Sequence, residues 1–517
     1  MIGKKSKRQA GFALLIMLVV LIGVASLGLS NILGSSVKYR DERNKMENTR
    51  VLLEAKEALL SYVVNYAVKN DLGKMGKLPC PDKTSAGTEG NQDPNCGAAG
   101  ENTFGLFPFK SLGKGKLEDA SNECLWYVVS GDYKENPPSE LVNWDAVGYL
   151  NLVDENGILK HGASANDFPI AFIISPGVTI NQARNKDASF SECKANNIIV
   201  NYLEGGPNID YVTDLPPTAD TLWAILTTPE SASLGNVNYN DQVVAVYRDE
   251  LWDRVKLLGD LSFNNEAGVE AVSKIELLTK SLAECIAAYG NEASNVNGQL
   301  PYPAPVDLDP INVDQDEYRN EGNYDDSNAI RYGRFPQVLD DSVMNQPSFV
   351  LDVTTVPATA TVLATTVKSY CERLIPLVTD YDEGFWNNWK DHFFYIVSED
   401  FDSSSVLPKN ANKCDLRIGS KRCITIDGKI NKVAAMVVFA GEAEVGLDRI
   451  WWWDDATGTT NIDNKANRNN YLEGANQTIY AGGVQDYTTA SDYSYCIEYD
   501  NATFQLAAIK CSNLDNI

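Results

Sequence analysis

FALLIMLVVLIGVASLGLSNILGSSV, residues 12–37, is a run of 26 residues without a charged side chain. Four basic residues precede this run within Met1–Ala10, and charged residues return at Lys38. A helix rises about 1.5 Å per residue, so about 20 apolar residues cross the hydrocarbon of a bilayer. The run therefore predicts a transmembrane segment over residues 12–37, with the N-terminus in the cytoplasm because basic residues come first.

The helical pattern continues beyond the apolar run. No Gly or Pro occurs between Asp41 and Tyr66, and apolar residues recur there at i, i+3 and i+4 spacing. We expect one long helix from about Phe12 to about Val68, apolar all round in its first half and amphipathic in its second. The residues that define the amphipathic stripe are Val51, Leu52, Ala55, Ala58, Leu59 and Val63.

The basic leader, the junction Gly11-Phe12-Ala13-Leu14-Leu15 and the apolar helix together resemble the class III signal of type IV pilins and type II secretion pseudopilins. The resemblance covers about the first 60 residues. It implies that a prepilin peptidase cleaves between Gly11 and Phe12 and that Phe12 becomes N-methylated. It also implies that the helix packs against other pilins or pseudopilins. An ordinary N-terminal membrane anchor is the alternative.

The sequence departs from the pattern of major pilins at Ile16. Major pilins carry a Glu at this position, which neutralises the terminal ammonium of the preceding subunit, because a charge in apolar surroundings needs a partner. In the family that Glu is typically absent from a tip pseudopilin of type II secretion. The resemblance therefore favours a minor or tip subunit, and the large region that follows the helix points the same way.

The region after the helix contains an internal repeat. Six pairs of short segments recur in the same order in both halves. Residues 201–205, NYLEG, recur identically at 470–474, and residues 123–130 are echoed at 391–398. The offset between paired segments rises from 228 to 268 along the chain, which indicates an insertion within residues 337–386 of the second copy.

Each copy begins with a helix and continues with short β-branched and aromatic runs bounded by turn residues. The predicted fold class is α+β: a long N-terminal transmembrane and amphipathic helix, followed by two duplicated pilin-like domains of a helix on an antiparallel sheet. The expected boundaries are a leader over 1–11, the transmembrane part over 12–37, a first domain over 38–260 and a second domain over 268–517.

Ten cysteines, an even number, all follow the apolar run. Translocation would place them in an oxidising compartment, where disulfides persist. Their pairing cannot be deduced from sequence, but bridges that close local loops give one expected arrangement. Zinc is disfavoured, because the chain has no CxxC pair and no nearby set of histidines. The expected pairs are Cys80–Cys96, Cys124–Cys193, Cys285–Cys371, Cys414–Cys423 and Cys496–Cys511.

An acidic stretch after residue 306 offers hard oxygen ligands of the kind that Ca²⁺ takes. The EF-hand spacing is absent, so a calcium site and a solvated acidic loop are both open interpretations. No other cofactor is predicted. The candidate calcium ligands are Asp307, Asp309, Asp314 and Asp316.

Three consecutive tryptophans, Trp451, Trp452 and Trp453, precede two aspartates. Consecutive residues of a strand face opposite sides, so at least one ring is exposed unless an interface covers it. Exposed aromatic rings beside carboxylates suit a surface receptor or a glycan. Core packing with one ring in a loop is the alternative.

Charge and motif content exclude several function classes. The 517 residues include 44 basic and 70 acidic side chains, a net charge of −26, which argues against a nucleic-acid partner. The two histidines, His161 and His392, are too few for a multi-histidine site, and His392 is expected to be a core or surface residue. No catalytic motif is present, so we expect no enzyme; a membrane-anchored periplasmic enzyme such as a glycosidase is the alternative.

Together these features predict a minor pilin-like subunit, tip or initiating, with a structural and adhesive role in a pilus or pseudopilus. The alternative within the same family is the tip pseudopilin of a type II secretion system. The expected partners are other pilins, the prepilin peptidase and the inner membrane. The expected location is the inner membrane before assembly, as a single-pass protein, and the periplasm or a cell-surface pilus afterwards.

Overall fold

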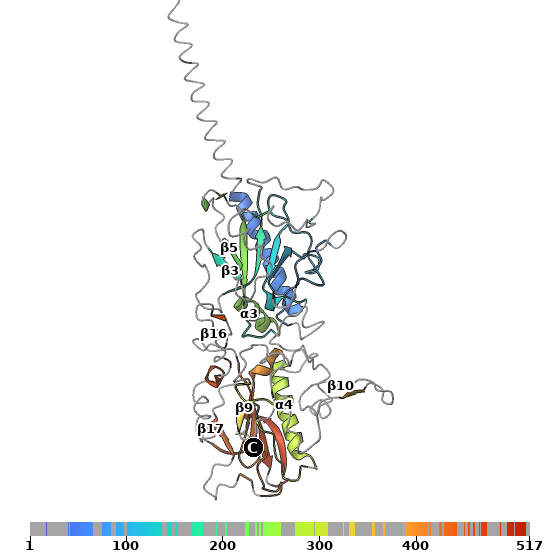
Figure 1. Ribbon diagram of the computed structural model, residues 1–517, viewed down its shortest axis with the longest axis vertical. Coiled ribbons are helices and arrows are strands. Elements are labelled where there is room, and N and C mark those ends of the chain that lie inside the picture. The colour runs from blue at the N-terminus through green and yellow to red at the C-terminus, as the bar shows by residue number, and fades with distance from the viewer. Residues whose placement is uncertain are drawn as a thin grey trace, which may run out of the picture.

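Two mainly antiparallel sheets, each covered by a helix, follow one another along the long axis of the computed structural model (Figure 1). We call the N-terminal sheet with its helices the first unit and the C-terminal sheet with its helix the second unit. The structure describes residues 17, 40, 42–65, 75–83, 89–97, 101–136, 142–146, 148, 150–153, 168–178, 193, 202–203, 223–226, 233–234, 237–238, 241–259, 274–293, 295–308, 324, 330–336, 354–356, 365–367, 386, 388–411, 413–414, 423–426, 429–441, 449, 453–454, 459–460, 465, 467–472, 486–487, 494–500 and 502–512.

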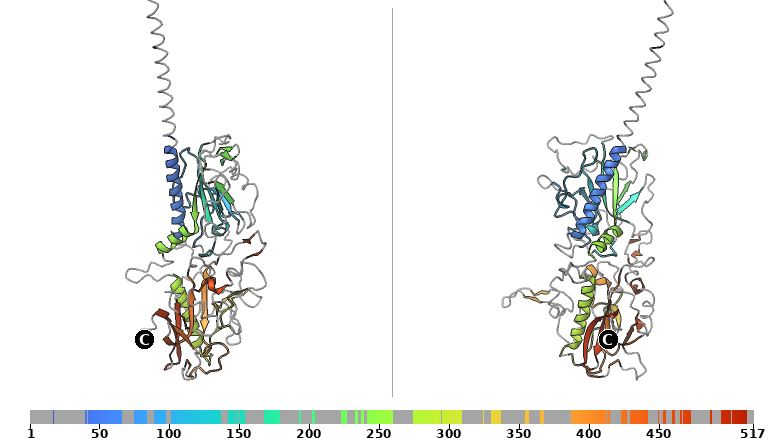
Figure 2. Two further views of the ribbon diagram at one scale, coloured as in Figure 1. Left: turned by 90° about the vertical axis from the view of Figure 1, so that its left-hand side faces the viewer. Right: turned by 180° about the vertical axis from the view of Figure 1, so that it is seen from behind.

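The first unit contains a four-stranded sheet in the order β1-β2-β4-β8, with antiparallel neighbours throughout. Residues 42–65 form a helix that runs along one face of this sheet, as Figure 2 shows in blue. Its apolar stripe, including Leu52, Ala55 and Leu59, is buried in the core, while Arg50 and Glu54 stay on the solvent side. The strands are β1 (Thr103–Leu106), β2 (Trp126–Val129), β4 (Pro169–Ser175) and β8 (Gln242–Tyr247).

Shorter elements complete the first unit. A two-stranded parallel pair joins β3 to β5, and β6 and β7 form a small hairpin. Helix α3 directly follows β8 and buries Leu251 and Trp252. The bounds are β3 (Leu150–Val153), β5 (Trp223–Leu226), β6 (Ser233–Leu234), β7 (Val237–Asn238), the 3-10 turn η2 (Gly131–Tyr133) and α3 (Arg248–Gly259).

The second unit is built around a larger sheet in the order β17-β13-β14-β12-β9, with β18 and β19 continuing from β14. Helix α4 (Lys274–Asn291) packs against β14, β18 and β19. Its Ile275, Leu278, Leu282 and Ile286 recur every three or four residues and are buried. The strands are β9 (Tyr332–Arg334), β12 (Phe393–Val397), β13 (Ile424–Ile426), β14 (Lys429–Phe439), β17 (Asp486–Tyr487), β18 (Ser494–Asp500) and β19 (Gln505–Lys510).

The two sheets share a strand path, because β1-β2-β4-β8 of the first unit has the same chain order as β9-β12-β14-β18 of the second. In each unit a Leu-Pro segment crosses the first of these strands at a glycine. A Cβ on Gly105 would lie 2.7 Å from the carbonyl oxygen of Asp82, and a Cβ on Gly333 would lie 1.9 Å from that of Ala304. Only glycine permits so close an approach of two backbones. The domain boundaries at 38–260 and 268–517 themselves stay predictions.

The predicted fold class is wrong in its first element. Among the residues that the structure describes, no helix is both long enough and apolar enough to cross a membrane. This finding contradicts the transmembrane part of the expected N-terminal helix and the single-pass inner-membrane location expected from the sequence. The described helix over residues 42–65 is charged on its outer side and covers the first sheet with its apolar side. Apart from Met17, residues 1–37 lie outside the described part of the chain.

Within the predicted insertion, 337–386, the structure describes one antiparallel hairpin of β10 (Thr354–Val356) and β11 (Thr365–Val367). A second short hairpin pairs β15 (Trp453–Asp454) with β16 (Thr459–Thr460). Two 3-10 turns, η6 (Lys390–His392) and η8 (Arg468–Asn470), complete the described elements.

Candidate functional site

The two units meet where the loop over residues 142–146 of the first contacts the η6 turn of the second. The backbone N–H of Val142 donates to Asn388 Oδ1 at 3.1 Å. Asn143 Nδ2 donates to the carbonyl of Asn388 at 2.8 Å and to Asp391 Oδ1 at 3.0 Å. Both asparagines are fully buried, so these hydrogen bonds form without competition from water.

A cluster of four ionisable side chains lies beside these hydrogen bonds. Lys465 Nζ lies 2.7 Å from Asp391 Oδ2 and 3.3 Å from Asp145 Oδ2. His392 Nε2 lies 3.3 Å from Asp145 Oδ2, and His392 Nδ1 lies 3.0 Å from the carbonyl oxygen of Ala440. All four side chains are at most 4% exposed. We call Asp145, Asp391, His392 and Lys465 the junction cluster.

The electrostatics of the junction cluster act most clearly on Asp145. Three basic side chains, those of His392, Lys465 and Arg449, act on the buried carboxylate of Asp145. Burial by itself raises the pKa of Asp145, but the charges of His392, Lys465 and Arg449 outweigh burial and hold that pKa well below its usual range.

Aromatic rings from both units surround the junction cluster. The ring centroid of Trp389 lies 4.9 Å from that of Trp144 and 5.7 Å from that of Trp252. His392 stacks on Phe439 with centroids 5.7 Å apart. Such edge-to-face and stacked contacts add to the apolar burial of the rings. The rings and the charges therefore hold the two units together as one buried junction.

Asp145, Asp391 and His392 also have the spacing of a metal-ligand set, with their ligand atoms within 4.8 Å of one another. A metal does not fit this set well, because the Lys465 ammonium already contacts both carboxylates where a bound cation would sit. The cluster contains no nucleophile with a free approach from solvent, since its members are buried. Its chemistry is that of a structural ion cluster.

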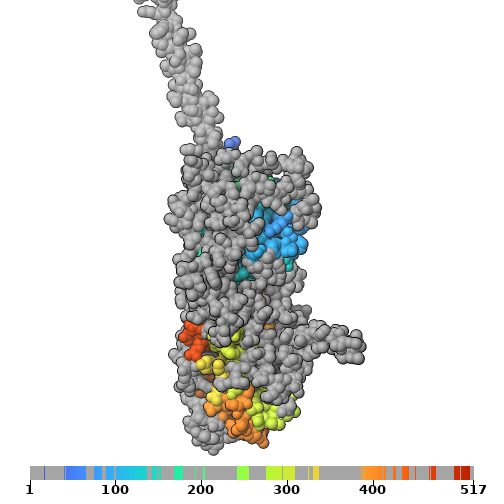
Figure 3. Space-filling view, in the orientation of Figure 1, coloured from blue at the N-terminus to red at the C-terminus, as the bar shows by residue number. Residues whose placement is uncertain are grey.

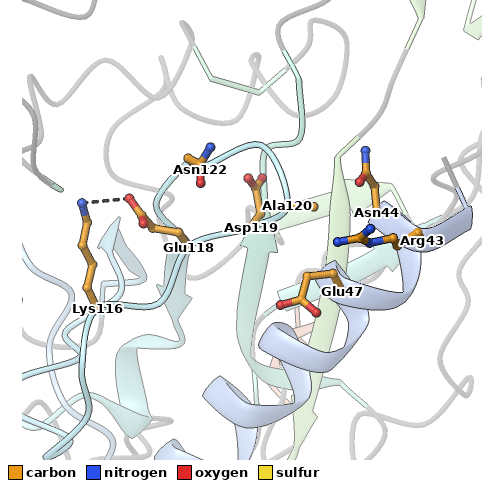
Figure 4. A pocket seen from close by; sticks show the side chains of 8 residues that line it. All are labelled: Arg43, Asn44, Glu47, Lys116, Glu118, Asp119, Ala120 and Asn122. Carbon is orange, nitrogen blue, oxygen red and sulfur yellow. Dashed lines mark ion pairs between the residues drawn. The ribbon is translucent and has the colours of Figure 1, made fainter. Parts of the chain in front are cut away.

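A separate open pocket of about 510 Å³ lies between the first turns of the helix over residues 42–65 and the segment over residues 116–122 (Figure 4). Lys116 pairs with Glu118 at 2.8 Å. Asp119 is buried, and its Oδ2 accepts hydrogen bonds from Ser175 Oγ and from the N–H of Gly177, both at 2.9 Å. The lining is polar, mixed in charge and bonded within itself. It consists of Arg43, Asn44, Glu47, Lys116, Glu118, Asp119, Ala120 and Asn122.

Four disulfides lie in the described part of the chain, and they are four of the five pairs expected from the sequence. Cys285 is also in a disulfide, whereas Cys371, its expected partner, lies outside the described residues. Two of the four bridges brace the first unit and two brace the second. They are Cys80–Cys96, Cys124–Cys193, Cys414–Cys423 and Cys496–Cys511.

The other predicted sites fall mostly outside the described residues. Asp307 is half-buried, and Trp453 lies in β15. The calcium site, the partner-binding tryptophans and the processing junction therefore stay predictions. The residues outside the described part are Gly11, Phe12, Asp309, Asp314, Asp316, Trp451 and Trp452.

Sequence reasoning missed the junction cluster. It placed His392 in the core or on the surface, and the core is where the histidine lies, fully buried. It gave no sign that Asp145 and Lys465, 320 positions apart, would contact each other. The one available signal was Asp391 beside His392 directly before an aromatic strand, in a protein with only two histidines.

Comparison of the chain with protein-family models, with curated proteins and with solved structures finds no match.

Proposed function

We propose that this chain is a structural subunit of a type IV pilus-like filament, present as a minor, tip or initiating component. It joins other pilins through its N-terminal segment after a prepilin peptidase cleaves between Gly11 and Phe12. The two units form a head that presents the second unit away from the filament. The role is mechanical and adhesive rather than catalytic.

The observation that carries the proposal is the buried junction. A head that transmits tension from one end to the other needs its two units fixed in line. The junction cluster supplies charge pairs that lie away from water, where salt does not screen them. The disulfides brace each unit separately, because they cross-link segments within one unit.

The N-terminal sequence supports the same proposal. The basic leader, the Gly11-Phe12 junction and the uncharged stretch after it occur together and in the order of the family signal. The resemblance to pilins implies a domain in which a helix covers an antiparallel sheet. The first unit has this layout, because the helix over residues 42–65 covers an antiparallel sheet.

The test is the mature N-terminus of the protein isolated from its own cells. We expect mass spectrometry to find N-methylated Phe12 as the first residue, and we expect Gly11→Leu to leave Met1 in place. Gly3→Leu, in the same leader, is the matched control and should be processed normally. A protein that keeps Met1 and still works fully would overturn the proposal.

Ile16 favours one variant of this function, the tip pseudopilin of a type II secretion system. A subunit without a carboxylate at this position cannot neutralise the ammonium of a subunit ahead of it, so it suits a place with none ahead. Loss of secretion, rather than loss of a surface fibre, in cells that lack the protein would select this variant.

A further inference from the structure

One buried guanidinium holds the backbone of both Lys465 and Asp391. Arg334 Nη2 donates to the carbonyl of Lys465 at 2.7 Å, and Arg334 Nη1 donates to the carbonyl of Asp391. The η8 turn that follows Lys465 is anchored as well, because Arg468 Nη1 donates to Tyr332 Oη at 3.0 Å. Figure 3 shows this turn in red-orange beside β9 in yellow. The lysine and the aspartate are therefore brought together by a fixed frame.

The two side-chain oxygens of Asp391 have different partners. Oδ2 lies 2.7 Å from Lys465 Nζ, whereas Oδ1 accepts a hydrogen bond from Asn143 Nδ2 at 3.0 Å. When a nucleophile adds to a carboxyl carbon, negative charge develops on the oxygens, and a positioned N–H donor stabilises that charge. Asn143 is such a donor on one oxygen, while the amine of Lys465 lies beside the other.

A second carboxylate lies beside the same amine. Asp145 Oδ2 is 3.3 Å from Lys465 Nζ and 3.3 Å from His392 Nε2. A carboxylate in contact with an ammonium can accept its proton and pass it to a neighbouring oxygen. An amine nucleophile needs this step, because the ammonium itself has no lone pair with which to attack.

The surroundings of these groups keep water out. The side chains of Asp145, Asp391 and Lys465 are 3%, 1% and 4% exposed. The rings of Trp144 and Trp389 lie with their centroids 6.2 and 5.6 Å from that of His392. Buried charges are costly, so a reaction that turns a buried cation and a buried anion into a neutral group is favoured there.

We propose that Lys465 and Asp391 condense to an intramolecular amide bond, with Asn143 and Asp145 as the groups that assist the reaction. The bond between Lys465 Nζ and Asp391 Cγ forms, and the bond between Cγ and Oδ2 breaks. The ammonium gives up two protons, one of them through Asp145, and both end on the departing oxygen as water. One positive and one negative charge disappear, so the step needs no other reactant.

The ion pair between Lys465 and Asp391 is the state before this reaction. Groups held in contact react as though each were present at about 10⁵–10⁸ M, which replaces the activation that an amide normally requires. The link would close a loop of 74 positions around the face of the second unit that meets the first. It would strengthen the junction whether or not the chain is part of a filament.

An exposed ion pair of similar length serves as the matched control. Lys56 Nζ lies 2.6 Å from Glu250 Oε1, but the Glu250 side chain is 41% exposed. Water competes for both groups at such a site, so contact alone should not produce an amide there.

Peptide mapping of the purified full chain by mass spectrometry, after reduction of the disulfides, tests the proposal. Trypsin does not cut after a lysine whose amine is in an amide. We expect one branched peptide that joins residues 391–409 to residues 450–468 and is lighter than their sum by one water molecule. Neither segment contains a cysteine, so no disulfide can mimic the link. The control peptides, residues 51–56 and 249–254, should be recovered separately.

Two variants test the roles of the residues. Lys465→Arg keeps a positive charge but has no amine nucleophile, so the branched peptide should be absent. Asp145→Asn removes the proton acceptor and should slow formation of the link at least about 100-fold.

Three outcomes would overturn the proposal. They are recovery of residues 391–409 and 450–465 as separate peptides from the unaltered protein, a link from Lys465 to residues 135–160 instead, and the same link in Lys465→Arg. The unaltered protein decides the main question, so a variant that fails to fold does not obscure it. None of these peptides includes Gly11, so the filament proposal is tested separately.

Discussion

Lys465 Nζ lies 2.7 Å from Asp391 Oδ2 and 3.3 Å from Asp145 Oδ2, so one ammonium of the second unit neutralises a carboxylate of each unit. Water cannot replace this cation, because all three side chains are at most 4% exposed. The contact between the units therefore depends strongly on the Lys465 ammonium, which contacts both carboxylates.

Replacing Lys465 by methionine should destabilise the protein strongly. The variant leaves two carboxylates buried with one cation fewer, and breaking a buried pair in this way costs about 3–5 kcal/mol. Urea unfolding measures the loss. The control is Lys280→Met, which removes a pair with Glu284 that is 47% and 41% exposed, where the cost should stay below about 1 kcal/mol. Equal effects of the two substitutions would contradict the role given to the junction cluster.

The stability of the protein should fall in acid through Asp145. Its pKa is held low in the folded state, against about 3.9 in an unfolded chain, so the unfolded state binds a proton more readily. This contribution is fully present above about pH 4 and is lost as the pH falls toward the folded-state pKa.

Thermal unfolding between pH 6 and pH 3 measures this dependence. Asp145→Asn should be less stable at neutral pH and should show a shallower acid decline than the wild type. Asp249→Asn, at a side chain that is 61% exposed, is the control and should keep the full decline. An identical decline in Asp145→Asn would show that other groups cause it.

The close crossing at Gly333 predicts a large effect from one methyl group. A Cβ there would lie 1.9 Å from the carbonyl oxygen of Ala304, so Gly333→Ala must push two backbones apart. We expect a loss of at least about 1–3 kcal/mol in unfolding free energy. Gly115→Ala is the control, because nothing lies within 4 Å of its Cβ position. A neutral Gly333→Ala would mean that the Leu-Pro segment is free to move.

The disulfides should differ in their contribution according to the loops that they close. Cys124–Cys193 spans 69 positions and Cys414–Cys423 spans 9. In the chain-entropy model these loops correspond to about 4 and about 2.5 kcal/mol. Double Ala variants of each pair, compared by urea unfolding, should rank in this order. A larger loss from the short bridge would point to native-state packing around Cys414 rather than chain entropy.

Short-range patterns in the sequence predicted several local features correctly. The i, i+3, i+4 spacing around Leu52, Ala55 and Leu59 identifies the buried stripe of the helix over residues 42–65, because helical periodicity depends only on neighbours in the chain. Four disulfide pairs followed from the preference for closing local loops.

The pattern of charge-free residues led to a wrong prediction of a membrane-spanning helix in the fold, because hydropathy shows that a segment can avoid water but not how it is placed. The helix that the structure describes farther along the chain, over residues 42–65, serves the core of the first unit.

The junction cluster required the tertiary structure. Asp145 and Lys465 are separated by 320 positions, and no periodicity links residues that come together only when two units dock. The local spacing of apolar residues determined the buried side of the helix over residues 42–65. Long-range packing decided which charged side chains share a buried site, because those residues come together only when the two units dock.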